Sequence, residues 1–284
     1  MTRIRRLLPL LLAVVLLLCS CAPAAADGEI QALFINVGKA DAALFFLGEE
    51  RYLIDTGTKD SHEQLMRVLE VYGVDHLHGV LVTHTDKDHA GGLKKMLKTG
   101  LRVDRLYAPA LHSEKSLEDH RVYEAAEQYG VPLTWLHAGE FLAAADGSVF
   151  HVLGPLSQDN ENENNNSLVL RLVTAQGEML LTGDMEREEE AELMQQGLIS
   201  QAQVLKVAHH GEGDSTSRSF ALVVRPQWAI ISTNTEAEPD TPDSDVLSNL
   251  RQARASVAVT QQAEVGIMVT LSNGQATAQQ IDWQ

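Results

Sequence analysis

Several side chains that can bind metal ions lie in one short stretch of the 284-residue chain, residues 83–92, which reads THTDKDHAGG. Its imidazoles and carboxylates are ligand types that zinc and manganese accept in proteins. The stretch directly follows an apolar run, and alternate residues of an extended chain point the same way, so several of these groups can converge on one ion. They are His84, Asp86, Asp88 and His89. So dense a group at the end of a strand indicates a metal site rather than an ordinary polar loop.

The chain on either side is expected to alternate short strands with helices, because apolar or alternating runs are separated by glycines and charged turns. The expected strands are 30–37, 42–47, 51–54, 80–83, 102–107, 133–136, 150–153, 167–174, 179–182, 204–208, 228–232, 257–260 and 266–271. The expected helices are 61–72, one that follows His89, 118–129, 187–195, 217–224 and 244–253. Since no internal linker, charge block or repeat divides this body, the simplest architecture is one domain of two sheets covered by helices.

The overall charge argues against one class of function. The chain has 22 Lys+Arg and 39 Asp+Glu, a formal net charge of −17. A surface that coats nucleic acid needs clustered Lys and Arg to neutralise phosphates, so sequence-independent coating is not expected. A local metal-assisted site for a phosphate ester is compatible with this charge.

The first residues have the pattern of an export signal. Three arginines precede an apolar run at 7–18, which is too short for an ordinary membrane-spanning helix. The run ends Leu18-Cys19-Ser20-Cys21, which resembles the bacterial lipobox, so Cys21 is expected to carry lipid and to become the first mature residue. Cleavage after Ala26 is the alternative. Both cysteines lie here, so no internal disulfide is expected in the mature protein.

Further motifs along the chain resemble those of a known family. They are FINVGKADA at 34–42, YLIDTG at 52–57, NNSLVL at 165–170, LTGD at 181–184 and LKVAHHG at 205–211. Together with His-x-Asp-x-Asp-His at 84–89, they resemble the metallo-β-lactamase superfamily, and most closely the hydrolase domain of the ComEC competence proteins. The resemblance covers about residues 31–274. It implies an α/β fold, a four-layer αββα sandwich.

The resemblance also implies two divalent metal ions, zinc or manganese. The residues implied for the first ion are His84, Asp86 and Asp184, with Asn165 or Asn166 nearby in place of the third histidine of ordinary lactamase-like sites. The residues implied for the second ion are Asp88, His89, the bridging Asp184 and, as a further candidate, His209. The ions would share and activate a water for attack on a phosphodiester.

Asp88 and His210 are the expected catalytic residues. Neighbouring residues of a strand point oppositely, so at most one of His209 and His210 should face the ions. The other would hold the substrate phosphate or protonate the leaving group. Asp55 follows a strand and precedes a Thr-Gly pair, so we expect it to hydrogen-bond the turn near the site rather than bind metal.

One departure from the family pattern lies near the C-terminus. Where the family shows a Gly-His-Pro histidine, this chain has Thr241 before Pro242. Either His209 or the neighbouring Asp240 completes the second metal site, or the second ion is weakly held.

These features predict an exported, membrane-tethered, metal-dependent hydrolase. The expected segments are a signal peptide at 1–20, a short tether at 21–28 and a hydrolase domain at 29–284. The protein would be anchored by lipid on Cys21 to the outer face of the bacterial cytoplasmic membrane. Its oligomeric state is left open by the sequence.

The expected substrate is a phosphodiester, either nucleic acid or a phosphorylated cell-envelope polymer. The same metal pair would also suit a lactone or another ester, since fold alone does not choose the substrate. A third reading is a binding lipoprotein with a degenerate metal site, which Thr241 would favour if the second ion is lost.

Overall fold

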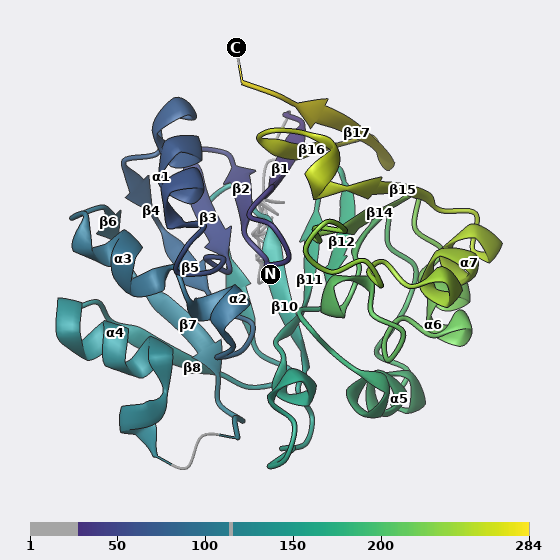
Figure 1. Cartoon of the computed structure of the whole chain (residues 1–284), viewed down its shortest axis with the longest axis horizontal. Coiled ribbons are helices and arrows are strands. Elements are labelled where there is room, and N and C mark those ends of the chain that lie inside the picture. The colour runs from purple at the N-terminus through teal and green to yellow at the C-terminus, as the bar shows by residue number, and fades with distance from the viewer. Residues whose placement is uncertain (1–27, 114–115, 284) are drawn as a thin grey trace, which may run out of the picture.

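The computed structural model describes residues 28–113 and 116–283 of the chain. Two mixed β-sheets face each other, and helices cover the outer face of each sheet (Figure 1). Apolar side chains fill the space between the sheets and the space between each sheet and its helices. This is an α/β four-layer αββα sandwich, so the predicted fold class is confirmed.

The first sheet has eight strands. In spatial order they are β17 (Gln275–Ile281), β16 (Gly266–Ser272), β1 (Ile30–Ile35), β2 (Ala43–Leu47), β3 (Glu50–Ile54), β5 (Gly79–Leu81), β7 (Leu106–Pro109) and β8 (Leu133–Leu136). Strands β17 to β3 pair antiparallel, whereas β3, β5, β7 and β8 are parallel. The last residues of β3 and β5, Ile54 and Leu81, pair directly. Residues that follow these two strands therefore emerge side by side at one edge.

The second sheet has seven strands. In spatial order they are β15 (Ser256–Val259), β14 (Trp228–Ile231), β13 (Val204–Lys206), β12 (Gly177–Leu181), β11 (Val169–Thr174), β10 (Val149–Gly154) and β9 (Phe141–Ala143). Strands β12 to β15 are parallel, and Leu181 pairs with Lys206 where β12 and β13 end. A separate two-stranded sheet joins β4 (His76–Leu77) to β6 (Arg102–Val103).

The helices divide between the two outer faces (Figure 1). Those on the first sheet's side are α1 (His62–Val71), α2 (Lys87–Ala90), α3 (Leu93–Lys98) and α4 (Arg121–Tyr129). Those on the second are α5 (Arg187–Gln195), α6 (Arg218–Val224) and α7 (Ser244–Gln252). Short 3₁₀ turns are η1 (Leu117–Asp119), η2 (Glu163–Asn166), η3 (His209–Gly211) and η4 (Thr260–Gln262).

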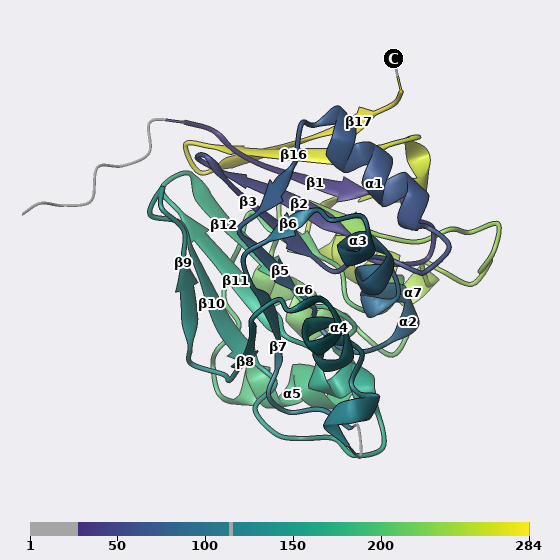
Figure 2. The same ribbon diagram turned by 90° about the vertical axis from the view of Figure 1, so that its left-hand side faces the viewer.

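The last strands return to the first sheet, so the two halves of the chain are not independent. Figure 2 shows β16 and β17 lying along β1. At Gly266, which has φ +148°, a Cβ atom would lie 2.1 Å from the carbonyl oxygen of Phe34, so only glycine fits this crossing. Phe34 packs against Phe45, and the ring centroid of Phe45 lies 5.7 Å from that of Phe150 in the second sheet, within the central core.

Three strands of the structure lie outside the predicted ones. They are β4, β9 and β17. Strand β17 reads QATAQQI, which has no apolar run, and it forms because it pairs with β16 at the edge of the sheet. Strand β9 is also at an edge and exposes Phe141. Edge strands have one side open to water, so their sequences carry a weak hydrophobic signal.

The predicted signal peptide, Cys21 and almost all of the tether lie outside the described residues. Of the helices that the structure does describe, none has the length and apolar character that crossing a membrane requires. The lipid anchor therefore stays a prediction.

A buried ion pair ties the two halves together near the edge where β12 and β13 end. The Nζ of Lys206, at the end of β13, lies 2.7 Å from Oδ2 of Asp41, in the loop after β1. Both side chains are at most 7% exposed. The backbone N–H of Asp41 also donates to the carbonyl of Asp88 in α2. The pair thus links β13, the β1–β2 loop and α2.

We predict that Lys206→Met lowers the free energy of unfolding by about 3–5 kcal/mol, because it leaves the Asp41 charge buried and unpaired. The double variant Lys206→Met/Asp41→Asn should regain most of this loss, since no lone charge remains. Denaturant titration of the parent, both single variants and the double variant measures the coupling. Additive losses would show that the two residues do not act as a pair.

Glu189 of α5 is another buried ionisable side chain, and it has no hydrogen-bond or ion-pair partner in the described part of the chain. Its side chain is 3% exposed, and neither carboxylate oxygen has a hydrogen-bond partner among the described residues. Burial, and then the charge of Glu192, raise the pKa of Glu189 well above its usual range. The folded protein therefore favours the neutral acid at this position.

Because folding then requires proton uptake above the unfolded pKa of about 4.3, this residue reduces stability increasingly as pH rises from there towards its folded pKa. We expect Glu189→Gln to melt at a higher temperature than the parent at pH 8 and at a similar temperature near pH 4. The gain at high pH is about 1.4 kcal/mol for each pH unit between the two pKa values. The exposed Glu188→Gln serves as the control in the same melting series, and an equal gain in that variant would refute the role of burial.

Candidate metal centre

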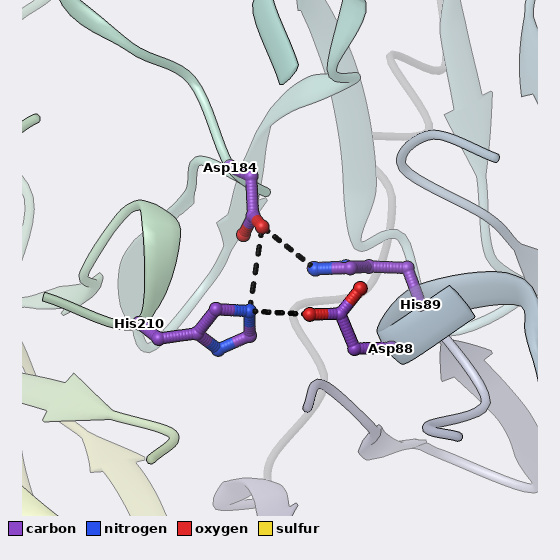
Figure 3. Close-up of side chains that lie close together, drawn as sticks. All are labelled: Asp88, His89, Asp184 and His210. Carbon is purple, nitrogen blue, oxygen red and sulfur yellow. Dashed lines mark ion pairs between the residues drawn. The ribbon is translucent and has the colours of Figure 1, made fainter. Parts of the chain in front are cut away.

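The candidate site forms where the ends of strands from both sheets meet. Asp88 and His89 lie on α2, shortly after β5, and Asp184 follows β12 in the second sheet. His210 lies in η3, directly after β13. Figure 3 shows the four side chains pointing toward one another. Each offers one ligand atom, and these atoms all lie within 4.8 Å of one another.

The carboxylate of Asp184 is at the centre of the group. Its Oδ2 lies 3.1 Å from Nε2 of His89 and 3.3 Å from Nε2 of His210. The same His210 nitrogen is 3.3 Å from Oδ2 of Asp88. On the other side, Nε2 of His84 is 3.9 Å from Asp184 Oδ2. Asp184 and the three histidines are buried, whereas Asp88 is 31% exposed.

Hydrogen bonds on the far side of each ring set the tautomer of two histidines. Nδ1 of His89 lies 2.8 Å from the Asp55 carboxylate, and Nδ1 of His210 lies 2.8 Å from the Ser232 carbonyl. Both partners are acceptors, so each Nδ1 carries the proton. With a cation bound beside Asp184, each ring would be neutral and would direct its Nε2 lone pair at that cation, as in metal-binding histidines whose other ring nitrogen donates to an acceptor.

The third histidine, His84, is fixed in the same way. Its Nδ1 lies 3.2 Å from the hydroxyl of Thr83. That hydroxyl donates its proton to Asp55 at 2.8 Å, so it can only accept from His84. Asp55 thus orients two of the three rings without facing the centre. The prediction placed Asp55 near the site and bonded to the Thr-Gly turn that follows it. Asp55 does lie beside the site, but the bond to the turn is corrected: its carboxylate instead accepts from Thr83 and His89, because the parallel pairing of β3 and β5 brings the residues after β5 alongside it.

The buried carboxylates of the centre favour positive charge on the groups around them. Burial alone would lower the pKa of His210, but Asp184 outweighs it and raises that pKa to about 10. Burial would also lower the pKa of His89, but Asp184 raises that pKa well above its usual range. Burial would raise the pKa of Asp184, yet the two imidazoles hold it well below its usual range. A divalent cation meets the same demand and leaves the rings neutral.

The donor atoms fit a divalent metal. Nε2 of His84, His89 and His210 and Oδ1 of Asp184 are buried, and none has a hydrogen-bond partner in the described part of the chain. Unpaired buried polar atoms are rare because each costs free energy. Metal bonds of about 2.1 Å place neighbouring ligand atoms roughly 3–3.5 Å apart, close to the separations around Asp184. His84 suits a ligand further, because burial and then the charge of His89 lower its pKa.

Asp86 lies at the outer margin of this centre. Its side chain is 53% exposed, and its Oδ2 is 3.9 Å from Nε2 of His84. The residues implied for the first ion, His84, Asp86 and Asp184, are therefore neighbours, although more loosely spaced than those around His89. Burial would raise the pKa of Asp88, but the His210 imidazole, 3.3 Å away, and the charge of His89 lower it to about 2.

The structure exchanges the roles expected for the two adjacent histidines. His210 faces Asp184, whereas Nδ1 of His209 lies 2.9 Å from Asp214 and 3.7 Å from Glu186, in a separate group. Both histidines have positive φ, 46° and 53°. The chain therefore turns sharply straight after β13, and the alternation of a strand, on which the prediction relied, no longer applies. His210 is corrected to the candidate ligand and His209 to a residue beside the centre.

Asn165 and Asn166 build a loop rather than approach the centre. The Asn165 amide donates to the Asp159 carboxylate at 3.1 Å, and the Asn166 amide donates to the Asp159 carbonyl at 2.7 Å. The residue after them, Ser167, instead accepts a hydrogen bond from the backbone N–H of Asp184 at 3.1 Å. The predicted approach of either asparagine to the first ion is thus corrected: the side chains of this motif shape the wall of the site.

Thr241 is buried next to the centre but bonded elsewhere. Its hydroxyl lies 2.6 Å from that of Thr233 and donates to the carbonyl of Glu238. The following Pro242 packs on Gly211, where a Cβ atom would lie 2.9 Å from the proline ring. The exposed Asp240 belongs to none of the possible metal-binding groups of the described residues. Among the described residues, it is His210 rather than Asp240 or His209 that lies beside Asp88 and Asp184.

Comparison with known proteins identifies the family. Residues 35–233 match the family described as the metallo-beta-lactamase superfamily. The chain belongs to the metallo-beta-lactamase superfamily. This confirms the resemblance read from the motifs. Members of this fold usually bind divalent metals such as zinc, in agreement with the donor atoms around Asp184.

Relatives of the ComEC type are found within this superfamily. The chain is 33% identical over 256 residues to ComE operon protein 3 of Bacillus subtilis, covering 83% of this chain and 32% of that protein. It is 28% identical to Recombination protein 2 of Haemophilus influenzae, covering 78% and 26% of the two chains. The chain thus spans about a third or less of the length of these relatives.

Solved structures of the superfamily share the fold at low sequence identity. Zinc-bound PqqB from Methylobacterium extorquens has a TM-score of 0.55 at 12% identity, covering 84% of this chain and 99% of PqqB. A diphosphatase of the PhnP family has a TM-score of 0.53 at 15% identity, covering 85% and 97% of the two chains. At this identity the likeness concerns the fold alone.

We predict that the two adjacent histidines differ sharply in their effect on metal binding. His210→Gln removes a ligand atom beside Asp184 and should weaken binding of zinc or manganese by more than the 10–100-fold typical of second-shell changes. The matched variant His209→Gln alters the neighbouring residue and should retain at least a tenth of the parent's affinity. Metal content after dialysis against a chelator of known affinity measures both variants. The reverse order of the two would mean that η3 turns the other way in solution.

Proposed function

We propose that this protein is a metal-dependent phosphodiesterase whose substrate is nucleic acid. The observation that carries the proposal is the buried Asp184 carboxylate, which faces the Nε2 atoms of three histidines whose rings are oriented by hydrogen bonds at Nδ1. Divalent ions, two in number and either zinc or manganese, would bind there and supply Lewis-acid activation of the scissile ester and of a water. His84, His89, His210, Asp88 and Asp184 would hold them, with Asp86 at the open side.

Two residues at the rim have the chemistry to assist the reaction. Lys39 is partly buried, pairs with Glu212 and lies near enough to Asp88 to interact with its charge. An ammonium in this place would stabilise negative charge that develops on a phosphate. His209 is held by the Asp214 carboxylate, with its ring centroid 6.2 Å from that of His210. We assign the proton transfer to the leaving group to His209, rather than to His210.

The choice of nucleic acid over other phosphodiesters rests on two supports. One relative is named a recombination protein, and another is named a competence protein. The fold itself accommodates phosphorus-ester chemistry, since one solved neighbour is a diphosphatase. Export and a lipid tether on Cys21 remain part of the proposal, on the strength of the sequence at 18–21 alone. They would place the site outside the cytoplasmic membrane.

The test is hydrolysis by the metal-loaded protein of four substrates: bis(p-nitrophenyl) phosphate, single-stranded DNA, a choline phosphodiester and a lactone. We expect the first two to be hydrolysed. Asp184→Asn should reduce both rates by more than 100-fold, because a ligand is lost where even second-shell changes cost 10–100-fold. Asp104→Asn, an exposed carboxylate at the end of β6, is the control and should leave both rates unchanged.

Other outcomes would point to other functions. Hydrolysis of the lactone alone would make the protein an ester hydrolase, and hydrolysis of the choline ester without DNA would favour an envelope polymer. Full metal content with no turnover of any substrate would indicate a binding protein.

A further inference from the structure

A basic pocket adjoins the metal centre on the outer side of α2. It has a volume of about 590 Å³ and lies between the loop after β3 and helices α2, α3 and α4. The charged residues that line it are Lys59, Lys87, Lys94, Lys95, Arg121 and Asp60. Five cations thus meet a single lining carboxylate, on a chain whose formal net charge is −17.

Most of these cations form no ion pair with a carboxylate of the described residues. Lys94 pairs with Glu124 of α4. The other four cations make no ion pair with any residue that the structure describes. Gathering like charges without counter-ions destabilises the folded state, if only slightly at an exposed surface. Such a cluster is therefore better explained by an anionic ligand than by folding.

The pocket and the metal centre share one wall. Lys87, which lines the pocket, directly precedes Asp88 of the centre on α2. The loop that carries Lys59 is fastened to α2: the N–H of Thr56 donates to the carbonyl of His89 at 2.7 Å, and that of Gly92 donates to the carbonyl of Gly57 at 3.0 Å. Figure 1 shows α2 near the middle of the molecule with α3 and α4 outward of it. A chain leaving the centre across α2 would enter the pocket.

We propose that this pocket binds the phosphate backbone of a single-stranded nucleic acid whose scissile phosphodiester lies at the metal centre. This rests on the proposed function and names the place where the strand beyond the cleaved bond is held. Lysine and arginine contacts to phosphates supply affinity without sequence preference. No lining residue is aromatic, so bases would not stack there. The net negative charge of the chain would repel the strand in general, so that this cluster of cations would direct where it binds.

A single phosphate would need fewer cations than the pocket offers. A strand carries one charge per nucleotide, so several successive phosphates can be neutralised together, and each contact releases counter-ions. The subsite should therefore act on long substrates and not on a small phosphodiester that reaches only the metal centre.

The experiment compares the parent with the triple variant Lys59→Gln/Lys95→Gln/Arg121→Gln, both metal-loaded. Lys87 is left unchanged because of its place beside Asp88. The substrates are a 30-nucleotide single-stranded DNA and bis(p-nitrophenyl) phosphate. We expect KM for the DNA to rise at least tenfold at low salt with kcat unchanged, and both constants for the small ester to stay the same. The slope of log KM against log salt should fall by about 2, which is roughly 0.7 for each of three lost contacts.

A matched control separates this subsite from a general effect of charge. The variant Arg218→Gln/Arg251→Gln/Arg254→Gln removes three exposed cations on the side of α6 and α7 and should leave KM for DNA within twofold of the parent. Equal effects in the two triple variants would overturn the proposal. So would an unchanged KM for DNA in the pocket variant. Melting temperatures of both variants verify that they are folded.

Binding distinguishes failure of this inference from failure of the proposed function. If the small phosphodiester is not hydrolysed at all, the proposed function fails, and fluorescence anisotropy with a labelled 30-nucleotide strand still tests the pocket. Weaker binding by the pocket variant than by the control variant would uphold the subsite. Loss of binding to poly(glycerol phosphate), with binding to DNA unchanged, would refute nucleic acid as its ligand.

Discussion

Asp184 places a carboxylate, 2% exposed, at the point where the two sheets end side by side. A buried charge of this kind costs several kcal/mol unless positive charge surrounds it. Here His84 and His89, from the segment after β5, and His210, from the segment after β13, reach it from opposite sheets. The site therefore cannot form in either sheet alone, and its stability depends on the packing that brings the strand ends together.

The groups behind the histidines explain why the centre is precise. Asp55 holds His89 directly and His84 through Thr83, while the Ser232 carbonyl holds His210. Asp55 itself has φ +59°, an uncommon backbone conformation for a residue with a side chain. Strain of this kind persists only where surrounding contacts enforce it. Three hydrogen bonds from Thr83 and His89 do so here.

Local patterns in the sequence were sufficient to predict about half of the residues of this site. His84, Asp86, Asp88 and His89 lie within six residues, so their convergence follows from the spacing alone. Asp184 needed the resemblance to the family, because an isolated aspartate after a strand equally predicts a helix cap. The predicted α5 agrees with the structure at both ends, 187–195, since a strongly helix-forming sequence specifies it.

The remaining assignments depended on backbone geometry that no sequence pattern displayed. Which of His209 and His210 faces Asp184 is decided by two successive positive φ angles, which non-glycine residues rarely adopt. Asn165 and Asn166 are drawn into the loop by Asp159, six to seven residues before them. The asparagine-rich stretch gave no sign of this local competition. Ser167 and Ser232 contribute through one hydroxyl and one carbonyl, and such roles leave no signature in residue type.

The balance of charge around the centre accounts for its proposed ion content. Lys206 neutralises Asp41, and no other cation is close enough to pair with the centre's carboxylates among the described residues. Asp55, Asp86, Asp88 and Asp184 then contribute four negative charges, which two divalent ions would cancel. A single ion would leave two negative charges at the place where an anionic phosphodiester must approach. With two ions the centre would be neutral, and the cations beyond α2 would then set the direction from which the proposed polyanion approaches.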